Sequence, residues 1–245
     1  MSLSRSALLI GNPGEETSTK YCPGVLADMK RYETFFLSPL GGAWRKDEIK
    51  VFKQPTRNIV EQYIRLINTF DYAVIIFCGH GWHSNSQGSM IELNSSEDIS
   101  VAKLREGASK QILILDSCRT KGPEVLQESM RKFAEFRTLD SQRSREYFDK
   151  HIEKCETGLI LINSCAIGET AGENSSGGYF SFSLVEETKA RIDRQEPNQA
   201  QPYVVDIAEA FRFAKDKVLV LSNERQHPEI EKGRRNYFFP FGILV

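Results

Sequence analysis

The chain has 245 residues, of which 40% are hydrophobic, and this is enough to bury the core of one large domain. Its 32 basic and 33 acidic residues give a net charge of -1, so the sequence lacks the single-sign field that holds nucleic acid or an anionic membrane. No apolar run approaches the roughly 20 residues that span a bilayer, and the apolar stretch at 7–10 is too short for a signal sequence.

The cysteines are odd in number and scattered, which favours a reducing compartment over a disulfide framework. They are Cys22, Cys78, Cys118, Cys155 and Cys165. With the balanced charge, this predicts a soluble cytoplasmic protein without nucleic-acid or membrane partners. We expect a single domain over residues 1–245, and the sequence says nothing of the oligomeric state.

In the first half of the chain, apolar runs that end in turn-forming residues predict strands, and apolar residues at helical spacing predict helices. The expected elements are a strand at 7–10, a helix that starts at 24 and ends before 39, a strand at 48–52, a helix at 58–70, and strands at 72–78 and 111–116. Asn58 and Glu61 form a candidate capping pair for the second helix. Strands that alternate with helices predict an α/β fold with a mostly parallel sheet and helices on both faces.

The second half of the chain begins with a highly charged segment, 119–157, that separates the strand at 111–116 from the next one. The elements expected after it are a strand at 158–163, a surface loop at 168–179, helices at 180–192 and 204–220, and a last strand within 237–245. The sequence contains no internal repeat and no coiled-coil heptad.

Two reactive side chains lie just past the ends of predicted strands. His80 follows the strand at 72–78 and Cys118 follows the strand at 111–116. Since the carboxyl ends of parallel strands share one edge of a sheet, the two side chains can face each other there. An imidazole beside a thiol promotes thiolate formation and later protonates the leaving amine, and the N–H groups of Gly81 and Cys118 are candidate donors to the oxyanion.

Each of these residues also has a plainer interpretation. A lone cysteine near a strand end is usually packed in the core, and a lone histidine is often bonded to a carbonyl. Cys78, His80, His83 and Cys118 could be drawn as zinc ligands, but they lack paired ligand spacing and a strand alternates its faces. A histidine and a cysteine that both follow strand ends favour a Cys/His dyad, without a metal.

Two motifs resemble those of the caspase-like cysteine peptidases, and of metacaspases and their bacterial relatives more than of animal caspases. They are Phe77-Cys-Gly-His-Gly81, similar to the family's Ser-Gly-His-Gly, and Asp116-Ser-Cys118, similar to its Asp-x-Cys. Residues 163–182 resemble the family's next strand, substrate loop and following helix, and 226–228 its closing segment. The resemblance covers nearly the whole chain and implies a three-layer α/β/α sandwich with a mostly parallel sheet of about six strands.

The resemblance implies a role for each matched residue. His80 is the general acid/base, Cys118 the nucleophile, and Asp116 and Asp28 are acids of the specificity (S1) pocket. Animal caspases have Gln-Ala-Cys-Arg-Gly at the nucleophile and accept aspartate in a pocket built from arginines. Two carboxylates in one pocket suit a guanidinium instead, so we predict cleavage after Arg, with Lys second. For Asp28, a carboxylate favoured by the dipole at the helix start is the open alternative.

The resemblance also implies a protein or peptide substrate, and a role in stress, defence or cell death. Self-cleavage within 119–157 is a hypothesis with candidates Arg131, Lys132, Arg137, Arg143 and Arg145, beside a plain solvated charged helix. Some metacaspases need calcium, but the chain has no calcium loop and we assign no cofactor or metal. Cys165 is a weaker candidate nucleophile without a neighbouring histidine. A catalytically silent caspase-like module that serves as a scaffold or sensor is the alternative function.

Overall fold

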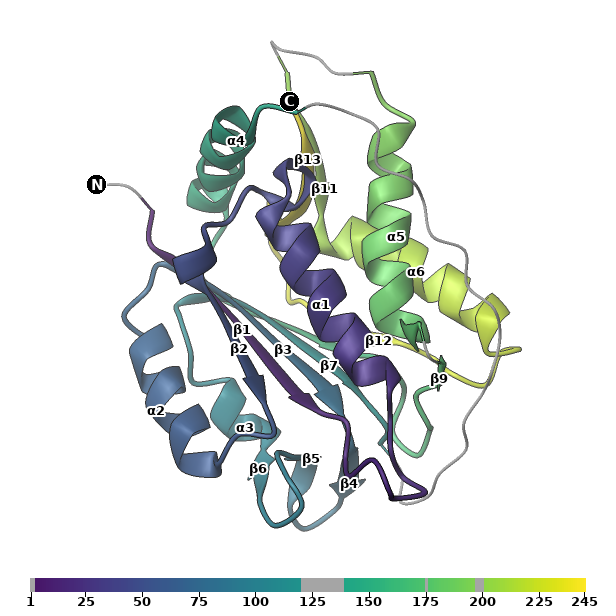
Figure 1. Ribbon diagram of the computed structural model, residues 1–245. Helices are drawn as coiled ribbons and strands as arrows, with labels where there is room; N and C mark the ends of the chain where they lie inside the picture. Colours follow the sequence, from purple (N-terminus) through teal and green to yellow (C-terminus); the bar gives the residue numbers. More distant parts are fainter. Residues whose placement is uncertain (1–2, 120–138, 175, 197–200) are drawn as a thin grey trace.

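The computed structural model describes residues 3–119, 139–174, 176–196 and 201–245. Its centre is a six-stranded sheet in the order β12-β8-β7-β3-β1-β2 (Figure 1). These strands are β1 (Arg5–Asn12), β2 (Ile49–Lys53), β3 (Tyr72–Gly79), β7 (Lys110–Ser117), β8 (Gly158–Asn163) and β12 (Glu229–Glu231). The first five pair in parallel and β12 pairs antiparallel with β8, so the expected mostly parallel sheet of about six strands is confirmed.

Each face of the sheet buries its own core, because successive side chains of a strand point to opposite faces. One core packs Leu9, Val74 and Ile114 against α1 (Gly24–Leu37), α4 (Ser141–Lys154), α5 (Tyr179–Asp193) and α6 (Ile207–Leu221). The other packs Leu8, Ile75 and Leu113 against α2 (Arg57–Ile67) and α3 (Val101–Leu104). The predicted three-layer arrangement is therefore confirmed (Figure 1).

Several small sheets were not predicted. The antiparallel strands β4 (Gly81–Ser84), β5 (Gly88–Glu92) and β6 (Asp98–Ser100) follow β3, and β11 (Tyr203–Asp206) pairs with β13 (Pro240–Leu244). The expected last strand exists as β13, but β12 provides the sixth strand of the central sheet. None of the helices in the described ranges is long and apolar enough to cross a membrane.

Two predicted helix starts were wrong, because the caps lie elsewhere. Thr56 caps α2 through a bond from Ile59 N of 3.4 Å, in place of the Asn58 and Glu61 pair. Asp206 caps α6 and accepts from the backbone N–H groups of the second and third helical residues at 2.9 Å, so that helix begins at Ile207.

The segment 168–179 was expected to be a surface loop, but three of its glycines, Gly172, Gly177 and Gly178, are buried. It forms the hairpin of β9 (Glu173–Asn174) and β10 (Gly177–Gly178) beside α1. Of the charged segment, Arg131, Lys132 and Arg137 lie outside the described residues, whereas Arg143 and Arg145 belong to α4. Arg145 donates to Glu48 at 2.8 Å, so this helical and ion-paired residue is a poor site for cleavage.

Candidate active site

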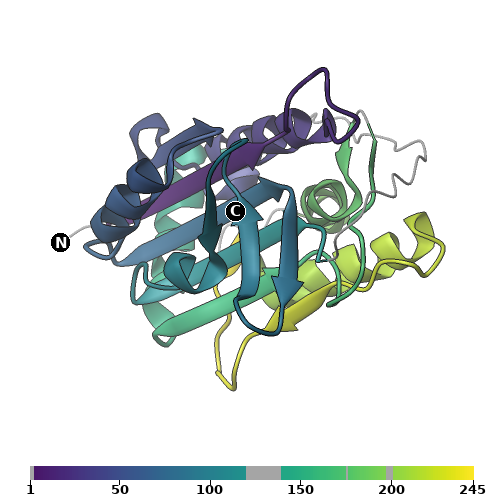
Figure 2. The ribbon, with the colours of Figure 1, turned by 90° about the horizontal axis from the view of Figure 1, so that it is seen from below.

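The carboxyl edge of the sheet brings the two predicted catalytic residues together. Gly79 at the end of β3 pairs with Ser117 at the end of β7, and His80 and Cys118 are the next residues. Gly79 has φ 148° and a Cβ there would lie 2.6 Å from Asn12 O, so only glycine allows the chain to leave the strand in this direction. In Figure 2 the strands point toward the right, and the loops after β1 and β8 lie at this same end of the sheet.

His80 is held by the loop at 13–23. Its Nε2 lies 2.6 Å from Lys20 O and 3.5 Å from Cys22 Sγ. Since a carbonyl oxygen only accepts hydrogen bonds, Nε2 carries a hydrogen, and in the neutral ring Nδ1 is therefore the base. The loop itself is fixed by a bond of 2.7 Å from Cys22 N to Pro13 O. The contact with Lys20 was not predicted, because a backbone carbonyl leaves no signal in the residue type.

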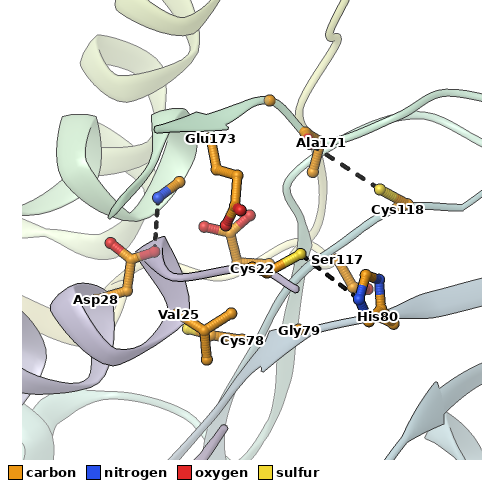
Figure 3. A pocket seen from close by; sticks show the side chains of 13 residues that line it. Cys22, Val25, Asp28, Cys78, Gly79, His80, Ser117, Cys118, Ala171 and Glu173 are labelled. Carbon is orange, nitrogen blue, oxygen red and sulfur yellow. Dashed lines mark hydrogen bonds between the residues drawn. The ribbon is translucent and has the colours of Figure 1, made fainter. Parts of the chain in front are cut away.

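Cys118 lines a pocket of about 40 Å³ together with His80 (Figure 3). Its Sγ is directed at Ala171 O, 3.9 Å away. Burial, and then the charge of Asp116, raise the pKa of the Cys118 thiol, whereas hydrogen bonding with the backbone of Ala171 lowers it. The thiol is therefore protonated when no substrate is bound. The other lining residues are Cys22, Val25, Asp28, Cys78, Gly79, Asp116, Ser117, Ala171, Gly172, Glu173 and Gly178.

Gly81 begins β4 beside the nucleophile strand. A Cβ there would lie 2.8 Å from Met90 O and 2.9 Å from Ser117 Oγ, so the position requires glycine. The bond of 2.9 Å from Glu92 N to His80 O marks these two residues as a hydrogen-bonded pair. The next pair, Gly81 with Ile91, is then a non-bonded pair, and the Gly81 N–H points away from β5. This orientation suits the predicted oxyanion donor, although Gly81 itself is not among the lining residues.

The two predicted pocket acids converge on Gly178. A Cβ on Gly178 would lie 2.8 Å from Asp116 Oδ2 and 3.2 Å from Asp28 Oδ2. Asp28 Oδ2 accepts from Gly178 N at 2.6 Å, and Asp116 Oδ2 accepts from Ser181 N at 3.0 Å. Burial is the largest cause that raises the pKa of both carboxyl groups, and the charge of Asp116 raises the pKa of Asp28 further.

Two charged residues of the pocket region were missed. Arg31 binds the Asp28 carboxylate and Ser176 O, and its guanidinium lies 5.0 Å from the ring of Phe182. Glu173 hangs from β9 into the pocket above Cys22 (Figure 3). Burial raises the pKa of Glu173 to about 7, and the charge of Asp116 adds to this rise. The segment 168–173 was noted in the sequence, but only the hairpin decides which of its glutamates faces inward.

Among known proteins, solved structures match the fold of this chain. No family model and no curated protein matches the chain. The crystal structure of caspase-1 from Spodoptera frugiperda covers 94% of this chain and 87% of its own, with a TM-score of 0.59 and 13% sequence identity. The fold is caspase-like. At this identity the likeness shows the fold alone, so the closer resemblance to metacaspases stays a prediction.

The other residues considered as zinc ligands or as a second nucleophile have different surroundings. His83 Nδ1 bonds Ser89 Oγ at 3.0 Å on the sheet of β4 to β6, whereas Cys78 is buried and lines the pocket. Cys165 is fully buried and donates to Ser117 O at 3.3 Å, so it is not placed as a nucleophile. Among the described residues, no group of three or more His, Cys, Asp or Glu side chains is arranged to hold a metal ion.

Proposed function

We propose that the chain is a caspase-like cysteine endopeptidase that cleaves peptide bonds after arginine and, less well, after lysine. The observation that carries the proposal is one pocket lined by Cys118, His80 and three carboxyl side chains, those of Asp28, Asp116 and Glu173. The thiol serves as the nucleophile and the imidazole as the general acid and base. The carboxyl groups favour a cationic substrate side chain.

In the first step, His80 Nδ1 takes the proton of the Cys118 thiol while the sulfur attacks the carbonyl carbon of the scissile bond. Because burial raises the pKa of Cys118, proton removal accompanies the attack and does not precede it. The Nε2–H bond to Lys20 O keeps the ring in the tautomer whose Nδ1 can accept this proton.

The tetrahedral intermediate then carries a negative charge on the former carbonyl oxygen. We assign the N–H groups of Gly81 and Cys118 as its donors. The imidazolium protonates the leaving amine as the C–N bond breaks, which leaves a thioester on Cys118. A water molecule that gives a proton to His80 hydrolyses the thioester, and the imidazolium returns that proton to the sulfur.

The charge of the pocket decides which substrate side chain it prefers. Three carboxyl groups line the pocket, those of Asp28, Asp116 and Glu173, and the neighbouring Arg31 pairs with Asp28, so the site can take a second cation. A substrate guanidinium forms charge-assisted bonds with carboxylates, whereas an aspartate side chain meets like charges. Arg31 already contacts Asp28, so Asp116 and Glu173 are the acids with more to gain from a bound cation.

The test is a set of fluorogenic peptides that end in Arg, Lys or Asp, with and without calcium, beside the variants Cys118→Ala and His80→Ala. We expect turnover of the Arg peptide, slower turnover of the Lys peptide, and none by either variant. No turnover of any peptide contradicts the peptidase, and equal cleavage after Asp and Arg contradicts the acidic pocket. Intact mass of the incubated protein tests self-cleavage.

One observation favours the silent module as a second candidate. The Cys118 thiol has a raised pKa and is directed at Ala171 O, as in a site that never forms a thiolate. The same peptide assay separates the two functions. A folded wild type that turns over no peptide, while its Cys118 stays resistant to alkylation, supports a scaffold or sensor.

A further inference from the structure

The segment at 164–172, here called the Ala171 loop, is held from behind by one buried amide. Gln226 is 0% exposed, its Nε2 donates to Ser164 O at 2.7 Å, and its Oε1 accepts from Gly172 N at 2.9 Å. One side chain therefore fastens both ends of the loop. Removing it would leave two buried backbone groups without these partners.

The Ala171 loop forms one side of the pocket. Ala171 O faces Cys118 Sγ, Gly172 lines the cavity, and Glu173 follows directly. Gly172 O also accepts from Tyr179 N at 2.8 Å, which closes the β9–β10 hairpin onto the start of α5. The position of Gly172 thus sets both the carbonyl beside the nucleophile and the acid above it.

The backbone that delivers Gln226 is strained. Asn223 and Glu224 follow the end of α6 with φ of 51° and 59°, and two consecutive non-glycine residues in the left-handed region are unusual. Gln226 N then donates to Ser222 Oγ at 3.1 Å, which fixes the turn. Such strain persists only where the surrounding structure requires one placement.

The neighbouring residue adds a second tether to the same loop. His227 N and Ala166 N both donate to Glu169 Oε2, at 2.7 Å and 3.1 Å, and His227 Nδ1 lies 2.7 Å from Glu169 Oε1. This tether is partly exposed, whereas the amide of Gln226 is wholly buried. The buried contact is therefore the one that water cannot replace.

We propose that Gln226 is a positioning residue of the substrate pocket, which acts on Glu173 and on Ala171 O through Gly172 and never touches the substrate. The inference rests on the proposed function for its effect on peptide cleavage, but its effect on the loop does not depend on that function.

The test compares Gln226→Met with the matched control Gln111→Met. Gln111 is 1% exposed and donates to Leu104 O at 2.7 Å near the start of β7, at the opposite end of the strand from the pocket. Both variants lose a buried amide, but only the first touches the Ala171 loop. We expect amide hydrogen exchange over 165–173 to rise about tenfold or more in Gln226→Met and to be unchanged in the control.

Kinetics give the second measurement. We expect the KM of Gln226→Met for the Arg peptide to rise about tenfold, with kcat close to wild type. Unchanged loop exchange in the folded variant, or faster exchange with an unchanged KM, overturns the inference. A wild type that cleaves no peptide overturns the proposed function instead. Hydrogen exchange of the Ala171 loop then still tests whether Gln226 holds that loop.

Two further variants keep the test decisive. Gln226→Glu retains an acceptor for Gly172 N but loses the donor to Ser164 O, so it replaces the Met variant if that protein does not fold, with the same expected changes. Glu224→Gly relieves the left-handed strain and leaves Gln226 in place, so we expect loop exchange and KM as in the wild type. A rise in loop exchange or in KM with Glu224→Gly alone contradicts the assignment to the amide.

Discussion

Asp28 had two interpretations in the sequence, a pocket acid or a carboxylate at a helix start. The residue is the fifth of α1 and only 2% exposed, so it does not occupy the helix N-terminus. Its carboxylate accepts from Gly178 N, and that glycine also lies against Asp116. The geometry therefore places Asp28 at the pocket, where Arg31 already neutralises part of its charge.

His80 and Cys118 could be predicted from the sequence, because each follows a strong apolar strand, whereas the role of Asp116 came from the resemblance of the motif around Cys118. The Lys20 carbonyl could not be predicted, since any residue at that point of the loop offers the same oxygen. The inward position of Glu173 could not be predicted, because it depends on a hairpin whose strands have two residues each. Strands this short have no apolar alternation to detect.

Gly178→Ala tests the convergence of the two acids. The backbone of Gly178, at φ -65° and ψ 143°, accepts alanine, but the new Cβ would crowd Asp116 Oδ2 at 2.8 Å. We expect the KM for the Arg peptide to rise about tenfold, with a stability loss of about 1–3 kcal/mol. Gly88→Ala, with φ 72° and nothing within 4 Å of the added Cβ, adds backbone strain without crowding and should leave the KM unchanged. An unchanged KM in folded Gly178→Ala would show that the acids do not bound the substrate site.

The raised pKa of Glu173 predicts a pH-dependent stability. Because burial raises this pKa to about 7, the neutral carboxyl is the form that the fold favours. Its stabilising contribution is complete below the unfolded pKa and is lost as pH rises through about 7, by about 1–3 kcal/mol. The melting temperature of the wild type should therefore fall relative to Glu173→Gln between pH 5 and pH 8. A constant difference across this range contradicts the burial of the acid.

At the scale of elements, β1, β3, β7 and β8 could be predicted because each is a continuous apolar run buried on both faces. The strands β4 to β6 are short and half-exposed, and β12 has three residues with glutamates on either side of Ile230. Such strands exist because a neighbouring strand pairs with them, and their own sequences contain little signal.

One buried arginine of β1 attaches α4 to the sheet, so its loss should strongly lower the stability of the fold. Arg5 is 1% exposed, lies 2.9 Å from Asp149, and stacks 4.5 Å from the Trp44 ring centre. Arg5→Met leaves Glu48 and Asp149 with the partly exposed Arg145 as their shared partner, so we expect a loss of about 3 kcal/mol in the free energy of unfolding.

The matched control is Arg45→Met, whose side chain is 64% exposed and pairs with the same Glu48. Exposed pairs contribute little, so this variant should lose less than about 1 kcal/mol. Chemical denaturation of both variants gives the comparison. Equal losses would mean that burial does not decide the strength of this ion network.

At the scale of the whole molecule, the caspase-like fold places two loops and the ends of two strands at one edge of the sheet. Fold alone does not establish activity, because one architecture hosts catalysts and silent modules alike. The claim that distinguishes this chain is local: a thiol, an imidazole and three acids face one small pocket. A test must therefore report the reactive atom and the preferred charge together.

Active-site labelling is the most direct measurement of that claim. The protein is incubated with matched peptidyl chloromethyl ketones that end in Arg or in Asp, and the adduct is located by mass spectrometry. The account predicts one adduct, on Cys118, from the Arg reagent only, with labelling that is lost in His80→Ala and slowed in Asp116→Asn. An adduct on Cys22 or Cys165, or equal labelling by both reagents, would contradict it.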